Sequence, residues 1–178
     1  MNTYFIGCLH IGHEALAKWR GFQDSFYHDD HLINQWNRVV NKRDLVYILG
    51  DITMETDEHY YKLDQLKGRK KVVLGNHDLG RHIPQLLNYV EEVSGMIDYK
   101  GMVLTHCPIH PNEIGFCRGN IHCHIHHKSK LEECVVGSRY QDEDSVPTET
   151  LHKYVCVDAH LLKYRPISLE NVLEKLKL

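Results

Sequence analysis

The sequence lacks several features that mark common functional classes. Its 21 lysines and arginines are outnumbered by 24 acidic residues, so no excess positive charge favours long duplex nucleic acid. No apolar run approaches the length of a membrane span, and the first residues lack a basic leader. The cysteines show no paired CxxC spacing. These absences predict a cytoplasmic protein with reduced thiols and no membrane partner.

Histidine and cysteine, in contrast, are frequent. The chain has 15 histidines and six cysteines among 178 residues, and many histidines fall in short polar clusters that suit metal binding or proton transfer. The length and the hydrophobic fraction of 42% predict one domain over residues 1–178 with a proper core. Bound cations would allow a phosphorylated substrate despite the net charge of −3.

The first half alternates apolar strand patterns with helical ones. We predict strands at 4–7, 45–49 and 70–74, and helices at 14–19, from 29 or 30 to 40, at 57–66 with Thr56 as N-cap, and at 81–88. Residues 21–28 read as a loop. Nearly continuous apolar strands indicate a sheet covered on both faces.

The second half has shorter elements. Strands are expected at 90–93, 96–99, 102–104 and 154–157, with a hairpin turn at Lys100 and Gly101. A final helix at 169–176 is expected to be capped by Ser168, and the polar residues 138–150 are expected to form a mobile loop. Trp36 falls on the apolar face of its helix and is assigned to the core.

Five loops carry possible metal ligands, and four of them follow a predicted strand. In α/β sheets, ligands bind at the carboxyl ends of strands, so these loops should point to one place. Imidazoles with one carboxylate and one amide favour Mn²⁺, Fe²⁺, Ni²⁺ or Zn²⁺ over Mg²⁺ alone. The candidate ligands are Cys8, His10, Asp51, Asn76, His77, His106, His124 and His126.

The segments CLH, GD, GNHD, TH and CHIH resemble, in order and spacing, the five motifs of calcineurin-like metallophosphoesterases (DxH, GD, GNH(D/E), H and GHxH). The likeness extends over essentially the whole chain, including Val157–Asp158 and residues 165–169. It implies an α/β fold, a four-layer α/β/β/α sandwich of two mixed sheets flanked by helices. It also implies a site for two divalent metal ions at the strand ends.

The resemblance also assigns roles. One metal would take Cys8, His10, Asp51 and His126, and the other would take Asp51, Asn76, His106 and His124, with Asp51 bridging the two ions. His77 would contact the phosphate or protonate the leaving oxygen, with Asn76 and His13 beside the substrate. A metal-activated hydroxide would attack phosphorus in line, the general chemistry of two-metal hydrolytic sites.

Two positions depart from the family pattern, which has Asp where this chain has Cys8 and Gly where it has Cys123. A thiolate ligates Zn²⁺ or Fe²⁺ well, so Cys8 either preserves the first metal position with a changed preference or weakens it. The motifs would bring Cys8 near Cys123, where oxidation or a local disulfide is conceivable. Cys123 is also read as a small residue on a strand.

The remaining histidines, cysteines and one aspartate have ordinary readings. His122, His124 and His126 alternate and would share one face of a strand. His110 is a second candidate for the substrate rim, and Asp158 either orients a site histidine or ends a strand. Surface or helix-face positions are assigned to His28, His31, His59, His82, His152 and His160, and buried apolar positions to Cys107, Cys117, Cys134 and Cys156.

Three functions are compatible with this reading. The first is a phosphoesterase acting on a small, nucleotide-like phosphodiester, because so short a chain leaves little surface for docking a phosphoprotein. The second is a metal-binding scaffold impaired by Cys8. The third is a Mn²⁺-dependent nuclease.

Overall fold

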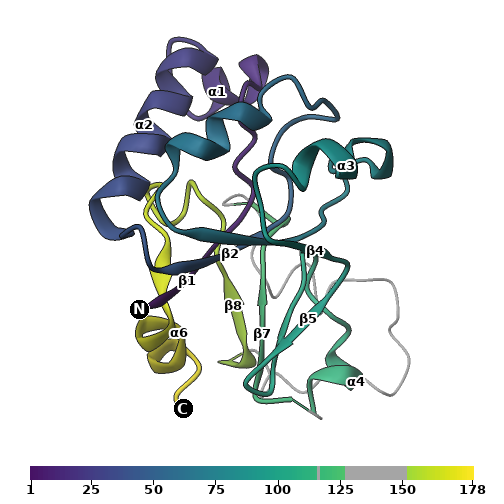
Figure 1. The fold of residues 1–178 in the computed structure, drawn as a ribbon. Coiled ribbons are helices and arrows are strands. Elements are labelled where there is room, and N and C mark those ends of the chain that lie inside the picture. The colour runs from purple at the N-terminus through teal and green to yellow at the C-terminus, as the bar shows by residue number, and fades with distance from the viewer. Residues whose placement is uncertain (116, 127–151) are drawn as a thin grey trace.

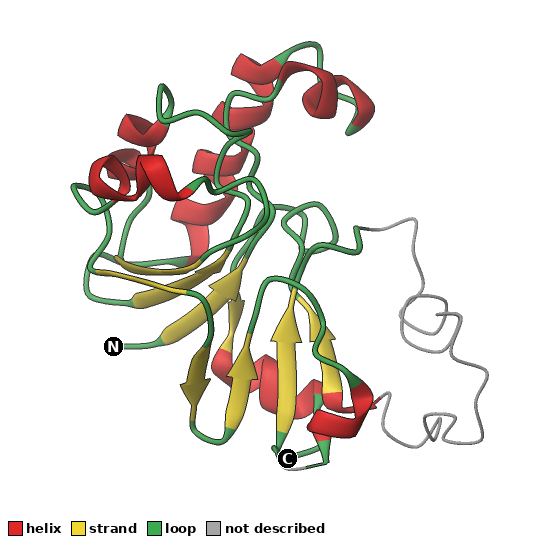
Figure 2. Cartoon of the chain, turned by 90° about the vertical axis from the view of Figure 1, so that its right-hand side faces the viewer, coloured by secondary structure: helices red, strands yellow, loops and turns green. Residues whose placement is uncertain are grey.

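Two mixed β-sheets form the centre of the protein (Figures 1 and 2). The structure, a computed structural model, describes residues 1–115, 117–126 and 152–178. The predicted loop at 138–150 and Cys134 lie outside the described residues. The first sheet has the order β4-β3-β2-β1-β9, with β1 (Thr3–Ile6), β2 (Leu45–Leu49), β3 (Arg69–Val73), β4 (Glu92–Ser94) and β9 (Ile167–Ser168). The second has the order β5-β6-β7-β8, with β5 (Ile97–Tyr99), β6 (Met102–Leu104), β7 (Gly119–His122) and β8 (Tyr154–Cys156).

Parallel pairing brings the carboxyl ends of the central strands to one edge of each sheet. Strands β1 to β4 are parallel, and only β9 runs antiparallel to its neighbour β1. In the second sheet β6, β7 and β8 are parallel, while β5 forms the antiparallel hairpin with β6. A parallel bridge between Gly7 and Asp158 joins the ends of β1 and β8. The loops after β1, β2, β3, β6 and β7 therefore meet where the sheets join.

Helices cover one face of the first sheet and complete the second core. They are α1 (Glu14–Trp19), α2 (Ser25–Val39), the 3₁₀ helices η1 (Tyr60–Gln65) and η2 (Gly80–His82), α3 (Ile83–Leu86), α4 (Pro111–Ile114) and α6 (Leu169–Lys175). The predicted α/β sandwich, two mixed sheets flanked by helices, is confirmed.

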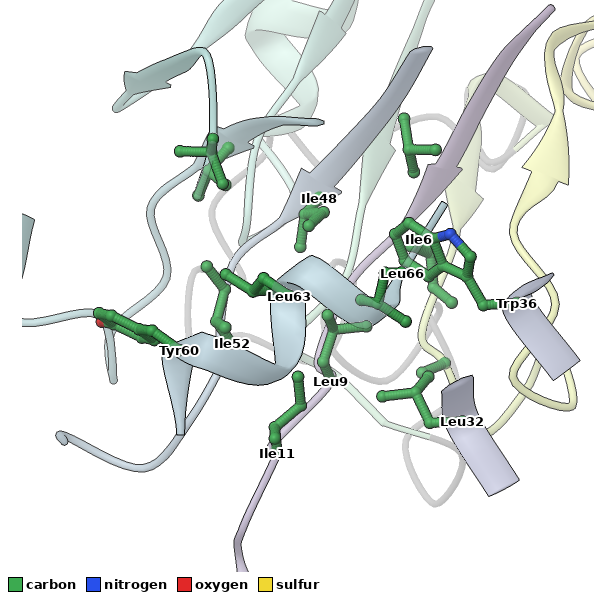
Figure 3. Close-up of a cluster of buried hydrophobic side chains, with 14 of the residues drawn as sticks. Ile6, Leu9, Ile11, Leu32, Trp36, Ile48, Ile52, Tyr60, Leu63 and Leu66 are labelled. Atoms are coloured by element: carbon green, nitrogen blue, oxygen red, sulfur yellow. The ribbon is translucent and has the colours of Figure 1, made fainter. Parts of the chain in front are cut away.

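The first core lies between the helices and the first sheet (Figure 3). Trp36 of α2 is fully buried, as predicted, against Ile6 of β1 and Leu66 after η1. Its indole Nε1 donates to the Lys67 carbonyl at 2.9 Å, which satisfies the buried polar atom. Alternate residues of the same strands face the second core, because successive strand side chains point to opposite faces.

The second core lies between the two sheets and is completed by α6. Its buried residues come from β1, β2, β6, β7, β8 and α6, and they include both Cys8 and Cys123. Ser168 caps α6 as predicted, accepting from Asn171 N at 3.3 Å. Cys8 and Cys123 thus belong at once to the core and to the edge where the loops meet.

Two helix predictions are wrong in their extent. Helix α2 begins at Ser25, four residues before the earliest predicted start, because the Asp24 carboxylate accepts from Tyr27 N at 3.0 Å and caps it. The expected helix at 57–66 is only a 3₁₀ helix over 60–65, and Thr56 instead accepts from Glu58 N in the preceding turn. Within the described part of the chain, no helix is long and apolar enough to cross a membrane.

Candidate metal centre

Asp51 lies between two histidines at the edge where the loops meet. Its Oδ2 atom is 3.7 Å from His10 Nε2 and 3.3 Å from His106 Nε2. Its Oδ1 atom accepts from the backbone N–H of His77 at 3.0 Å. Burial opposes ionisation, yet the hydrogen bond and charge of His106 lower the pKa of Asp51 to about 2. One ionised oxygen therefore faces an imidazole on either side.

Four lone-pair atoms converge at His106 Nε2. His106 Nδ1 donates to the Leu49 carbonyl at 2.8 Å, which leaves Nε2 for a ligand. That nitrogen lies 3.1 Å from Asn76 Oδ1, 3.1 Å from His124 Nδ1 and 3.3 Å from Asp51 Oδ2. Burial alone lowers the pKa of His106, but the hydrogen bond and charge of Asp51 outweigh it and raise the pKa. A proton here does the work that a cation would do between these atoms.

His10 provides the clearest test of whether a metal fits. The side chain is 4% exposed, and neither ring nitrogen has a hydrogen-bond partner. Burial, the largest cause, lowers the pKa of His10 to about 3, so the ring is neutral near pH 7. Buried polar atoms are almost always satisfied, so an unpaired neutral imidazole beside a carboxylate fits a missing cation.

Cys8 and His126 complete the half of the centre that contains His10. The ligand atoms of Cys8, His10 and His126 all lie within 4.8 Å of one another. The Nδ1 atom of His126 donates to Asp158 Oδ2 at 3.0 Å, so Nε2 is left for a ligand. Asp158 therefore orients a site histidine, one of its two predicted roles, and its bridge to Gly7 ends the strand as well.

The described residues contain two further groups that could hold a metal ion. One is Cys8, Asp51 and His106, and the other is His106, Cys107 and His124. Each set again places its ligand atoms within 4.8 Å of one another. The seven predicted ligands therefore come together, since Asn76 joins them through its contact with His106.

The predicted strand with three histidines on one face is wrong. Strand β7 ends at His122, which is fully buried beside Tyr154 on the face opposite the core. His124 and His126 follow in a loop with φ values of 68° and 44°. Cys8, His10 and Asp51 also have positive φ, between 51° and 53°. Left-handed backbone is costly for such residues, and its concentration here is typical of a functional site.

Glycines let the loops approach closely. A Cβ at Gly75 would lie 2.3 Å from Asp51 Oδ1, and one at Gly7 would lie 2.3 Å from Cys123 Sγ. We had attributed Gly75 to unusual backbone angles, but positive φ occurs instead at Gly50. Space for the Asp51 carboxylate is the reason that a glycine stands at position 75.

We expect Gly75→Ala to reduce metal affinity by at least about tenfold, because the added methyl group displaces the Asp51 carboxylate. Gly80→Ala is the matched control, since its Cβ meets no atom within 4 Å. Isothermal titration with Zn²⁺ measures both variants. Equal affinities would contradict the steric role of Gly75.

The predicted substrate residues surround His10 and Asp51. The rings of His77 and His13 lie 5.9 and 6.0 Å from that of His10, and Asn76 is exposed. The Nδ1 atom of His77 lies 3.3 Å from Glu55 Oε1. His110, the second rim candidate, instead accepts from Asn112 N at the start of α4.

Sequence reasoning missed three residues that fix the site loops. Arg20, with its side chain fully buried, donates to the Cys8 carbonyl at 2.9 Å and lies 3.8 Å from Asp158 Oδ2. Asp78 accepts from the N–H groups of Asp51, Ile52 and Gly75 at 2.8 to 3.0 Å, which ties two loops together. Glu55 holds the His77 ring. Only Asp78 had a sequence signal, as the fourth residue of GNHD.

Several burial predictions were wrong. His28, assigned to the surface, is 1% exposed and pairs with Asp29 Oδ1 at 2.8 Å and Arg20 Nη1 at 3.1 Å. Cys107, assigned to the interior, is exposed, while Cys117 and Cys156 are half-buried. The expected proximity of Cys8 and Cys123 is confirmed, because their side chains are hydrogen-bonded. Burial raises the pKa of the Cys123 thiol well above its usual value.

The pKa of His106 predicts a pH dependence of metal binding. Since Nε2 must lose its proton to bind a cation, we expect affinity to fall by at least about tenfold per pH unit below the raised pKa of His106. Asp51 stays ionised throughout, because its pKa is about 2. Co²⁺ titrations between about pH 6 and pH 8.5 measure the slope. An affinity independent of pH would contradict His106 as a ligand.

Known proteins resemble this chain without naming an activity. No protein-family model matches the sequence. The gene 66 proteins of Mycobacterium phages L5 and D29 are 43% and 40% identical over 82 residues. These alignments cover 43% of this chain and 40% of each phage protein.

Two other proteins match over nearly the full length. An uncharacterized protein of Methanocaldococcus jannaschii is 26% identical over 180 residues, which cover 97% of this chain and 90% of that protein. The crystal structure of a protein of unknown function from Aquifex aeolicus has a TM-score of 0.69 and 24% identity, with 98% of both chains covered. The second likeness supports the fold alone.

Proposed function

We propose that this protein is a metal-dependent phosphoesterase that uses two divalent cations, Mn²⁺, Fe²⁺, Ni²⁺ or Zn²⁺. The observation that carries the proposal is the position of Asp51 Oδ2, within 3.7 Å of His10 Nε2 and 3.3 Å of His106 Nε2. A carboxylate between two sets of imidazoles suits a bridge between cations about 3.5–4 Å apart. The unpaired ring nitrogens of His10 support the same reading.

Each half of the centre offers its own set of donors. Cys8, His10, Asp51 and His126 would hold one cation, and Asp51, Asn76, His106 and His124 would hold the other. Bound cations supply charge that neutralises phosphoryl oxygens and makes a water molecule more acidic. Asp158 and the Leu49 carbonyl fix the two imidazoles, His126 and His106, with their free nitrogens toward the centre.

His77 is the residue we assign to proton transfer. Its backbone N–H is held by Asp51 at 3.0 Å, and Glu55 lies 3.3 Å from Nδ1. A carboxylate on Nδ1 orients the ring and leaves Nε2 for the phosphate or the leaving oxygen. His13 and Asn76 would contact the substrate from the same side.

The substrate we propose is a small phosphodiester of the nucleotide type. Asn76 and His124 are exposed while Asp51, His10 and His106 are buried, so the centre is reached from the side of Asn76 and His124. The net charge of −3 disfavours a long polyanion, so the positive charge for one phosphate group would come from the cations.

Hydrolysis by metal-stripped protein tests the proposal. Mn²⁺, Ni²⁺, Zn²⁺, Fe²⁺ or Mg²⁺ is added back singly, and the release of nitrophenol from bis-nitrophenyl phosphate and nitrophenyl phosphate is followed. We expect turnover only after metal is restored, and faster turnover of the diester. No turnover with any metal, although elemental analysis finds bound metal, would refute the proposed function.

A further inference from the structure

Cys107 is placed differently from every other cysteine that the structure describes. It follows His106 directly after β6, it is exposed, and its Sγ lies within 4.8 Å of ligand nitrogens of both His106 and His124. The motif pattern assigns Asn76, His106 and His124 to this half of the centre and gives no role to the residue after His106. A thiol beside two imidazoles is a donor set that Zn²⁺ favours.

Hydrogen bonds fix the backbone that carries Cys107. Thr105 Oγ1 donates to the Cys107 carbonyl at 2.6 Å, and Asn120 Nδ2 donates to Thr105 Oγ1 at 2.9 Å. The His106 carbonyl accepts from Cys123 N at 2.8 Å. Both His106 and Cys107 are thus tied to β7 and the residue that follows it, so the thiol is held toward His124. A pre-organised donor loses little freedom when it binds a cation.

The two imidazoles beside Cys107 are short of donors. His106 Nδ1 is committed to Leu49, and His106 Nε2 faces His124 Nδ1 at 3.1 Å. Two ring nitrogens at this distance share at most one proton, or both bind one cation. The sulfur adds a third donor on the exposed side of the pair.

We propose that Cys107 is a thiolate ligand of the second metal position, so that each half of the centre contains one thiolate. Cys8 supplies the thiolate of the first half and Cys107 that of the second, and the thiol proton of Cys107 passes to solvent when metal binds. Thiolates favour Zn²⁺, Co²⁺ and Fe²⁺ over Mg²⁺ and Mn²⁺. This inference rests on the proposed metal centre, but it does not require that the centre hydrolyse a phosphoester.

Absorption by bound Co²⁺ tests the proposal without any assay of activity. Metal-stripped, reduced wild-type protein and the variants Cys107→Ser, Cys8→Ser and Cys117→Ser are titrated with Co²⁺, and the thiolate-to-cobalt charge-transfer band is recorded per bound ion. Cys117→Ser is the matched control, because Cys117 donates to the Ile114 carbonyl and belongs to none of the metal groups. Far-ultraviolet circular dichroism checks that each variant folds.

We expect Cys107→Ser to lose about half of the charge-transfer intensity of saturated wild-type protein, and Cys8→Ser to lose the other half. Loss of an outer partner of a metal ligand costs roughly 10–100-fold in affinity, so loss of a ligand should weaken Zn²⁺ binding at least tenfold. Full intensity and unchanged Zn²⁺ affinity in Cys107→Ser would overturn the proposal.

The outcome is separable from that of the proposed function. A halved band in Cys107→Ser, with no hydrolysis by wild-type protein, would keep Cys107 as a ligand and refute the phosphoesterase. Metal-dependent hydrolysis together with an unchanged band would do the opposite.

Discussion

Asp51→Asn removes nearly all metal-dependent hydrolysis, with an expected fall in kcat/KM of about 10³-fold. A bound metal contributes several kcal/mol to stabilising transition-state charge, and each 1.36 kcal/mol corresponds to a factor of ten. The Asn side chain preserves the shape of Asp51 and still offers an oxygen to His77 N. It carries no charge, however, and cannot place an anionic oxygen between His10 and His106. The fold is therefore preserved while the bridge is lost.

The measurement compares initial rates of diester hydrolysis at saturating metal, together with the number of metal ions bound per chain. Asp64→Asn is the matched control, since this exposed aspartate of η1 undergoes the same chemical change far from any candidate ligand group. We expect wild-type rates from Asp64→Asn and less bound metal in Asp51→Asn. Wild-type turnover by Asp51→Asn would remove Asp51 from the catalytic centre.

The position of the centre was predictable because strand ends are predictable. Buried parallel strands read as apolar runs, and the polar residues that follow them, such as Asp51 after β2 and His106 after β6, must meet at one edge. The order of motifs then supplied the ligands. No knowledge of side-chain packing was needed for this step.

The contacts that hold the ligands were not predictable in the same way. Arg20 lies in α1's C-cap position, yet it reaches the Cys8 carbonyl, which depends on how α1 packs beside the loop after β1. The His28 ring is buried because Arg20 and Asp29 satisfy its nitrogens. Residue-type averages place histidine at the surface and cysteine inside, so they failed for His28 and Cys107 together.

Cys8→Asp shifts the metal preference of the hydrolysis from Zn²⁺ toward Mn²⁺ and Mg²⁺, by about tenfold or more in the ratio of rates. A thiolate is a soft ligand that favours Zn²⁺, whereas a carboxylate suits Mn²⁺ and Mg²⁺. Cys8 is fully buried and belongs to two of the three ligand groups, so a change here alters the first metal position directly. Its Sγ also accepts from His124 N at 3.3 Å, a contact that a carboxylate oxygen can replace.

Rates with each metal, measured on wild-type protein, Cys8→Asp and Cys117→Ser, decide between the phosphoesterase and the scaffold. A shifted preference in Cys8→Asp alone identifies Cys8 as a ligand of a working centre. An unchanged preference would exclude Cys8 from the first metal position. If wild-type protein were silent with every metal while Cys8→Asp turned over substrate, the natural thiol would have disabled the reaction. The chain would then act as the metal-binding scaffold, since a carboxylate at position 8 would be what hydrolysis requires.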